Sequence, residues 1–157
     1  MANKLPLKVF ISYSHQDEKW KDDLLAQLTN MQMQGLISIW QDRMISPGDL
    51  WDDSIKQALR DSDLVLFMVS PSFMTSHYIW NDELPAAIER QKRKESRLVP
   101  IYVIPVESVD APFSPFQGLP RDHYNGNFLS QLGNRDTALF EIATSIRKLV
   151  MSMSGNF

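Results

Sequence analysis

The segment Leu64–Val69 reads LVLFMV and contains no polar side chain. A strand with one face in water alternates apolar and polar residues, whereas a strand covered on both faces is apolar throughout. Ser70 and Pro71 follow the run and end it, because proline cannot continue a central strand. The segment therefore predicts a central strand of a parallel sheet that has helices on both faces.

Three other segments are rich in residues that favour strands: Leu7–Ser12, Leu36–Trp40 and Leu98–Ile104. Between the strands, apolar residues recur at spacings of three and four, which predicts amphipathic helices after Ser14, Asp49 and Ser76. Gly35 is placed to end the first of these helices, and the same spacing predicts a last helix over 137–151. Residues 105–133 hold four prolines and three glycines, which predicts mostly loop with one short fifth strand.

The alternation of strands and helices predicts an α/β fold of three layers, a five-stranded parallel sheet with helices on both faces. Ligands of such sheets bind beyond the carboxyl ends of the strands, where the winding direction reverses. We therefore expect one crevice lined by Ser12–Asp17, Gln41–Gly48 and Ser70–Glu83. Ser14 and Asp17 have the spacing of a capping box at the start of the first helix.

The chain has 157 residues, which suits a single domain over 1–157 with a core from about 8 to 150. Its net charge is −3 and its one basic run, Arg90–Lys94, lies among helix formers, so we expect no nucleic-acid partner. No apolar segment approaches the roughly 20 residues of a membrane span, and the amino terminus lacks a signal-peptide core. A cytoplasmic protein is expected. Ser152–Phe157 is typical of the start of a linker and favours a fragment of a longer protein with a sensor domain behind it.

The sequence lacks the motifs of several common functions: it has no Walker A loop for nucleotide phosphates, no G-x-G-x-x-G for dinucleotides and no G-x-S-x-G for a serine nucleophile. The absence of cysteine excludes a disulfide framework and a thiol nucleophile. His15, His77 and His123 do not have the spacing of helical metal ligands, so we expect no metal and no cofactor. A response-regulator receiver would carry an acidic pair after the first strand, where this chain has Ser12-Tyr13-Ser14.

Four short motifs follow one another along the chain: VFISYSH at 9–15, WQDR at 40–43, ISPGD at 45–49 and SHYIWNDE at 76–83. Their order and separation resemble the bacterial type of TIR (Toll/interleukin receptor) domain, from about Lys8 to Val150. Each motif alone is weak, and the combination is specific. The family's flavodoxin-like fold, a five-stranded parallel sheet between helices, agrees with the fold predicted above.

The resemblance implies an activity and a residue for it. Many bacterial and plant members cleave NAD+ between nicotinamide and ribose, and they depend on a glutamate early in the helix after the third strand. Glu83 matches that position. The family also places an aromatic side chain near the glutamate. Here Tyr78 and Trp80 both stand close to Glu83, and the sequence leaves open which of them lies against the substrate.

The resemblance further implies that Asp42–Asp49 is the family's BB loop, which borders the active site and contacts neighbouring TIR domains. The hydroxyls of Ser12 and Ser14, beside the first helix start, are suited to phosphate oxygens. The implied substrate-binding residues are Phe10, Ser12, Tyr13, Ser14, Asp42, Arg43, Tyr78 and Trp80. The implied assembly residues are Met44, Ile45, Ser46, Pro47 and Gly48.

Each of these residues also has a purely structural interpretation. An acid at Glu83 stabilises the first turn of a helix without any substrate. Trp80 stands four residues before Leu84, which is the spacing of two core residues on one helix face. Other structural roles are a helix cap for Ser14, closure of the sheet top for Tyr13, core packing for Phe10, a surface ion pair for Asp42 and Arg43, and helix packing or a domain contact for Trp51.

Two functions follow from the resemblance. The first is an assembly-activated enzyme of bacterial antiphage defence, which converts NAD+ to nicotinamide and ADP-ribose or a cyclic isomer. One carboxylate suffices for this reaction, because cationic nicotinamide leaves as a neutral base and needs no proton donor. The alternative is an adaptor without activity, which recruits other TIR domains through Gln41–Gly48. The presence of Glu83 beside an aromatic residue favours the enzyme.

Overall fold

The computed structural model of the chain describes residues 3–40, 51–122 and 127–155. In this part of the chain, four strands form a parallel sheet in the order β2-β1-β3-β4. The strands are β1 (Leu7–Ser12), β2 (Ile37–Trp40), β3 (Leu64–Val69) and β4 (Arg97–Tyr102). Because β2 lies on one side of β1 and β3 on the other, the winding direction reverses between β1 and β3.

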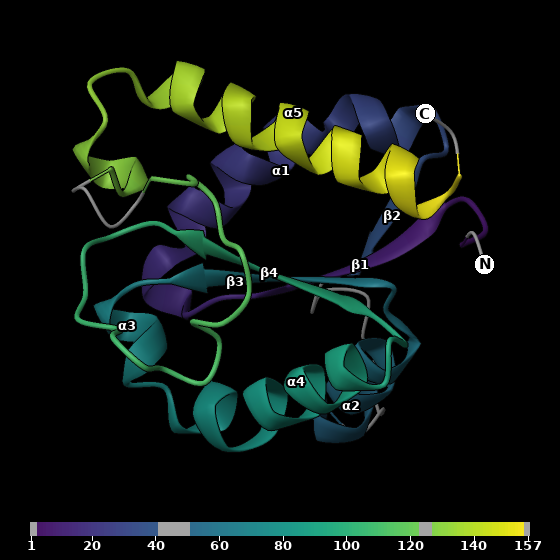
Figure 1. Cartoon of the computed structure of the whole chain (residues 1–157), viewed down its shortest axis with the longest axis horizontal. Coiled ribbons are helices and arrows are strands. Elements are labelled where there is room, and N and C mark those ends of the chain that lie inside the picture. The colour runs from purple at the N-terminus through teal and green to yellow at the C-terminus, as the bar shows by residue number, and fades with distance from the viewer. Residues whose placement is uncertain (1–2, 41–50, 123–126, 156–157) are drawn as a thin grey trace.

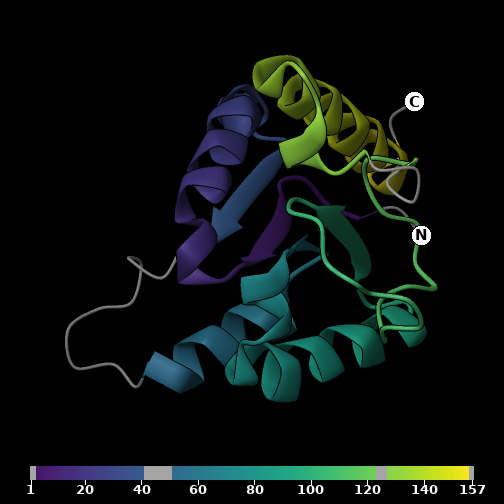
Figure 2. The same ribbon diagram turned by 90° about the vertical axis from the view of Figure 1, so that its left-hand side faces the viewer.

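Helices cover both faces of the sheet, as Figures 1 and 2 show. One face carries α1 (Glu18–Met33) and α5 (Arg135–Met153). The opposite face carries α2 (Trp51–Asp61), the short α3 (Pro71–Met74) and α4 (Leu84–Lys92). A π-helical turn at Ile79–Glu83 runs directly into α4, and 3-10 turns occupy His15–Asp17 and Leu129–Gln131.

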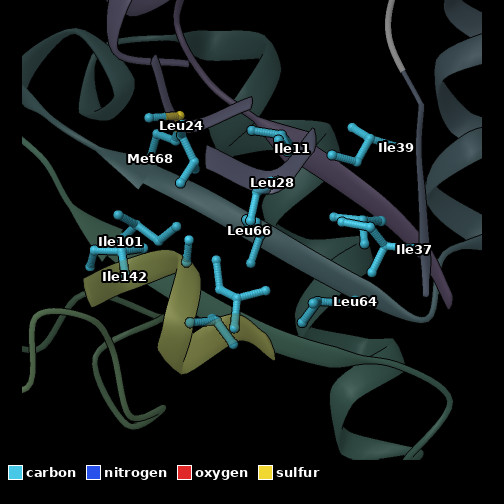
Figure 3. Packing of buried hydrophobic residues seen from close by; sticks show 14 of the residues in the cluster. Ile11, Leu24, Leu28, Ile37, Ile39, Leu64, Leu66, Met68, Ile101 and Ile142 are labelled. Atoms are coloured by element: carbon cyan, nitrogen blue, oxygen red, sulfur yellow. The ribbon is translucent and has the colours of Figure 1, made fainter. Parts of the chain in front are cut away.

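The central strand β3 is buried at all six positions, which confirms the prediction from its apolar sequence. Leu64, Leu66 and Met68 face the layer of α1 and α5, whereas the alternate residues of β3 face α2, α3 and α4. Figure 3 shows Leu66 close to Leu28 of α1, and Ile142 of α5 beside Ile101 of β4, all within one cluster. The sheet therefore has a separate hydrophobic core on each face, and both cores fix the carboxyl ends of β1 and β3.

The first helix ends where the sequence predicts. Gly35 has a φ of +73°, a left-handed conformation that a residue with a Cβ atom rarely adopts. Its position directly after α1 allows the chain to turn back into β2, where Ile37 and Ile39 pair with Leu7 and Val9 of β1. This pairing places the end of β2 beside the end of β1.

The predicted fifth strand is wrong for the described residues. Only Leu119 pairs beside β4, where it accepts a hydrogen bond from the Tyr102 amide at 2.8 Å and donates one to the Pro100 carbonyl at 2.9 Å. The neighbours of Leu119 explain why the ladder stops after one residue. Gly118 and Pro120 flank it, and glycine and proline both disfavour continued strand structure.

Candidate active site

A cavity of about 470 Å³ lies at the carboxyl ends of β1 and β3, where the winding direction of the sheet reverses. Its wall comes from the β1 end and the following turn (residues 10–16), from the first turns of α2, and from residues 72–83 after β3. The first and third of the three segments predicted to share a crevice therefore do so. The remaining one, Gln41–Gly48, lies outside the described residues.

Glu83 lies in the wall of this cavity and exposes 8% of its surface. The hydroxyl of Ser12, the last residue of β1, donates a hydrogen bond to its Oε2 atom at 3.2 Å. Ser12 is itself 1% exposed, so the bond is shielded from water and holds one carboxylate oxygen over the end of β1. The glutamate therefore faces the cavity in a restricted orientation.

The π-helical turn sets which residues lie beside Glu83. The Leu84 amide bonds to the Ile79 carbonyl, five residues back, and both side chains are buried. Pro85 gives the reason: it has no N–H for the carbonyl of Asn81, and its ring collides with that carbonyl in a regular α-helix. The helix widens ahead of the proline instead. Tyr78, five residues before Glu83, consequently lines the same cavity.

Tyr78 is anchored at its hydroxyl. The phenol donates to Asp52 Oδ1 at 2.9 Å, and Lys56 Nζ lies 2.8 Å from Asp52 Oδ2. Burial, followed by the hydrogen bond to Asp52 and the charge of that carboxylate, raises the pKa of Tyr78 well above its ordinary value. The hydrogen bonds from Lys56 and Tyr78 hold the pKa of Asp52 below its ordinary value. Tyr78 thus remains a neutral donor at physiological pH.

The VFISYSH motif at 9–15 supplies another wall of the cavity. Phe10 is 2% exposed and stacks on Trp40 of β2 with ring centroids 5.6 Å apart, so it belongs to the core and to the cavity lining at once. Tyr13 also lines the cavity, and the ammonium of Lys21 lies 5.1 Å from its ring centroid. Ser14 lines it too, while its hydroxyl accepts a hydrogen bond from the Gln16 amide at 3.3 Å.

The predicted capping box is only half correct. Ser14 caps the turn that precedes α1, but Asp17 does not complete the box. The Asp17 carboxylate is 3% exposed and accepts a hydrogen bond from the hydroxyl of Ser70, which also caps the Phe73 amide of α3. This contact ties the loop after β1 to the loop after β3, and it therefore sets the separation of two walls of the cavity.

The structure brings five of the predicted site residues to one cavity and places two others, Ser12 and Trp80, outside its lining. Ser12 lies behind Glu83 rather than in the lining, and Trp80 is partly buried against the core of the α2–α4 face, outside the lining. Asp42, Arg43 and the assembly residues 44–48 fall outside the described residues. The five in the lining are Phe10, Tyr13, Ser14, Tyr78 and Glu83.

Sequence reasoning missed several residues of the lining. Trp51 and Ile55 belong to α2, and the sequence suggested helix packing for Ile55 and helix packing or a domain contact for Trp51. The polar residues after β3 gave no signal beyond their position after a parallel strand. Three lining residues lie outside the segments predicted for the crevice: Ile11, Trp51 and Ile55. Six more lie within those segments but were not singled out from the sequence as site residues: His15, Gln16, Ser72, Thr75, Ser76 and Ile79.

The described part of the lining carries one carboxylate, that of Glu83, and no lysine or arginine. Such a wall favours a positively charged group next to Glu83, because an oriented carboxylate in a partly shielded site stabilises developing positive charge.

The described residues contain no cluster of histidine and acidic side chains placed to hold a metal ion. Within the same residues, every helix is too short or too polar to span a membrane.

Comparisons with known proteins agree with the sequence motifs. A family model described as TIR domain matches residues 9–134. An uncharacterised protein, y4lF of Sinorhizobium fredii (strain NBRC 101917 / NGR234), is 34% identical over 140 residues, which is 89% of this chain. The chain spans 42% of the length of that curated relative.

The similarity to solved structures is lower in sequence identity than the similarity to y4lF. The TIR domains of the activated Roq1 resistosome, which directly recognises the pathogen effector XopQ, match with 16% identity and a TM-score of 0.45. The match covers 88% of this chain and 84% of the Roq1 chain. Since the family model matches well over half of the sequence, the chain belongs to the TIR domain family.

Proposed function

We propose that this domain hydrolyses or cyclises NAD+ by breaking the bond between nicotinamide and ribose. The observation that carries the proposal is the placement of Glu83: its carboxylate, held by Ser12, lines a cavity at the reversal point of the sheet. The resemblance assigns the NAD+-cleaving glutamate of the family to this residue. The proposal therefore joins an activity known for some family members to a site with suitable geometry in this chain.

The chemistry of the bond fits a single carboxylate. As the glycosidic bond breaks, its electron pair moves onto the nicotinamide nitrogen, and positive charge develops on the ribose carbon and ring oxygen. Glu83 stabilises that charge and accepts hydrogen bonds from ribose hydroxyls.

The cation is then captured by a nucleophile. Addition of water gives ADP-ribose and releases one proton to solvent, whereas attack by a nucleophilic atom of the same molecule gives a cyclic isomer. Tyr78, which remains a neutral hydrogen-bond donor beside Glu83, is the aromatic residue we assign to the substrate. Trp80 is assigned to packing under this proposal, because it lies outside the cavity lining.

Assembly belongs to the proposal as well. The resemblance implies that residues 44–48 contact a neighbouring TIR domain, so activity is expected to depend on several domains coming together. The proposed setting is the cytoplasm of a bacterium, where NAD+ consumption or a nucleotide product serves antiphage defence. Neither a membrane nor nucleic acid is a proposed partner of this domain.

The test is a product analysis under forced assembly. Purified chain is incubated with NAD+ both in dilute solution and on a multivalent scaffold, and products are separated by chromatography. We expect nicotinamide in a one-to-one ratio with the sum of ADP-ribose and cyclic isomers, more on the scaffold, and none from folded Glu83→Ala. If the scaffolded wild-type chain releases no nicotinamide, the proposal is rejected in favour of a scaffold that acts by domain–domain contact.

A further inference from the structure

A second cavity, of about 540 Å³, lies at the amino ends of β3 and β4, the end of the sheet opposite to Glu83. We call it the amino-end cavity. Its walls come from Asn3, from Asp63, from the turn between α4 and β4, and from the end of α5. In Figure 1 the start of β4 and the carboxyl end of α5 lie on the right, whereas α3, which follows β3, lies on the left. The volume is in the range of small-molecule sites.

The described lining of the amino-end cavity is polar and contains no aromatic ring. Of the described residues there, only Met153 and Gly155 lack a polar side chain. Asn3, Gln91 and Ser152 carry amide and hydroxyl groups, which both donate and accept hydrogen bonds. Such a wall suits a ligand rich in hydroxyl and oxyanion groups, and it offers a flat ring nothing on which to stack.

The two carboxylates of this lining are engaged by other groups of the protein. Asp63 accepts hydrogen bonds from the Lys8 amide at 2.8 Å and from the Asn3 side chain at 3.3 Å. Glu95 forms an ion pair with Arg90 at 3.3 Å. The negative charge of each carboxylate is therefore balanced or oriented within the fold.

The two basic side chains of the lining, Lys94 and Arg97, form no ion pair within the described part of the chain. The basic run 90–94 is thus divided, because Arg90 and Arg93 pair with glutamates and Lys94 does not. Lys94 has a φ of +60°, a conformation in which glycine is favoured over a residue with a Cβ atom. The turn therefore holds an unfavoured residue that brings a positive charge to the cavity.

Ser96 lies between these two cations in the sequence and lines the same cavity. It exposes 7% of its surface, and its hydroxyl has no hydrogen-bond partner among the described residues. A buried hydroxyl without a partner is unfavourable and calls for an explanation. A ligand oxygen in the cavity would give this hydroxyl an acceptor.

Hydrogen bonds fix the turn between α4 and β4. The Glu95 amide donates to the Arg90 carbonyl at 2.9 Å, and the Arg97 amide donates to the Asp63 carbonyl at 2.9 Å. The Arg90 guanidinium also donates to the Ser62 carbonyl at 2.8 Å. The backbone that carries both free cations is therefore arranged before a ligand arrives, which lowers the entropy cost of binding.

We propose that the amino-end cavity binds a phosphate group, either free or carried on a small sugar. Lys94 and Arg97 are its cations, and the Ser96 hydroxyl is a further donor. A phosphate carries close to two negative charges and three acceptor oxygens, which these three side chains match. Lysine and arginine are the side chains that bind phosphate oxygens in proteins. The proposal goes beyond NAD+ cleavage and does not depend on Glu83.

The direct test is an NMR titration of the whole chain with inorganic phosphate, ribose 5-phosphate and ribose at constant ionic strength. We expect both phosphates to shift the amide signals of residues 94–97, and ribose to leave them unchanged. Either phosphate result supports the site: tighter binding of ribose 5-phosphate, by about threefold or more, assigns it to a sugar phosphate, and equal binding assigns it to free phosphate. Shifts confined to residues 10–16, at the cavity of Glu83, would overturn the proposal.

Variants separate binding from folding. Lys94→Gly removes a cation and the unfavoured φ together, so it should weaken phosphate binding about tenfold and raise the midpoint of thermal unfolding by about 2–4 °C. Arg97→Gln should weaken binding about tenfold, and Ser96→Ala about threefold. Lys92→Gln removes the same charge at an exposed residue outside the lining, and this control should bind phosphate as wild type does.

The outcomes distinguish this site from the proposed enzyme. Wild-type affinity for phosphate in folded Lys94→Gly would overturn the site and leave NAD+ cleavage standing. A chain that binds phosphate through Lys94 and releases no nicotinamide from NAD+ would support the site and reject the enzyme. Should Arg97→Gln fail to fold, Lys94→Gly and Ser96→Ala carry the same comparison.

Discussion

The hydroxyl of Ser12 is a small group with a large expected effect. It donates to a Glu83 oxygen in a buried setting, and hydrogen bonds to charged groups contribute about 1.5–3 kcal/mol. We predict that Ser12→Ala lowers kcat for NAD+ cleavage by at least about tenfold while the chain stays folded. Steady-state kinetics on the assembled protein check this prediction.

Ser38 provides the control for that change. It is exposed on β2, away from the cavity lining, so Ser38→Ala should keep wild-type kcat. An unaltered kcat in folded Ser12→Ala would mean that the orientation of Glu83 does not depend on the serine.

Tyr78 gives a prediction about pH. Its pKa is raised in the folded chain, first by burial and then by the hydrogen bond to Asp52. The folded state therefore keeps this proton at a pH where the unfolded state, with a pKa of about 10, has lost it. The stabilisation is complete below about pH 10 and is lost as pH rises through the folded-state value.

Chemical denaturation between about pH 9 and pH 11.5 tests this linkage. The free energy of unfolding should fall with rising pH more steeply for wild type than for Tyr78→Phe, and the difference in slope should approach about one proton. Identical slopes for the two proteins would show that the hydroxyl is not protected in the folded state.

At the scale of elements, the π-helical turn depends on one proline. Pro85 removes the hydrogen bond that a regular α-helix would make to the Asn81 carbonyl, and the widened turn brings Tyr78 and Glu83 to one cavity. We predict that Pro85→Ala leaves stability unchanged or raises it by about 1 kcal/mol, because alanine favours a helix. The same variant should lose at least about tenfold in NAD+ cleavage, since the two residues change their relative direction.

Denaturant unfolding and steady-state rates, measured on the same preparation, check both halves of the Pro85 prediction. Pro112→Ala, at an exposed loop proline outside the cavity lining, serves as the control. Full activity in Pro85→Ala would show that the spacing of Tyr78 and Glu83 does not require the proline.

The edge of the sheet beyond β4 depends on a glycine in a comparable way. A Cβ atom on Gly118 would stand 2.5 Å from Tyr102 Cε2 and 2.8 Å from the Pro100 carbonyl oxygen. The carbonyl belongs to β4 and cannot move aside, so Gly118→Ala should cost about 2–3 kcal/mol of unfolding free energy. Gly133→Ala, where nothing lies within 4 Å, should change it by less than about 0.5 kcal/mol. Equal midpoints of thermal unfolding for the two variants would contradict the close approach of Leu119 to β4.

At the scale of the molecule, most of the architecture follows from local pattern. The boundaries of β1 and β3 agree with the prediction. All six residues of β3 are buried, and the apolar run of each strand ends at a small polar residue, which marks the end of the strand in the sequence. The fifth strand could not be predicted reliably, because a single residue, Leu119, pairs there between a glycine and a proline. No periodicity exists in so short a contact.

The sequence predicts the site only where the order of the strands along the chain determines which residues come together. Glu83 and the VFISYSH segment reach one cavity because parallel strands β1 and β3 are neighbours. The sequence did not reveal the π-helical turn at Ile79–Glu83, which accompanies the placement of Tyr78, and not Trp80, in the cavity lining. The contact of Asp17 with Ser70 joins residues 53 positions apart and has no local signal.

The central claim is that a single oriented carboxylate, that of Glu83, breaks the nicotinamide–ribose bond. The most direct measurement compares nicotinamide release by assembled wild type, Glu83→Gln and Glu89→Gln, the last being the same substitution at an exposed site on α4. We predict a loss of at least about a hundredfold in Glu83→Gln and wild-type release in Glu89→Gln. Release by folded Glu83→Gln at the wild-type rate would contradict the claim.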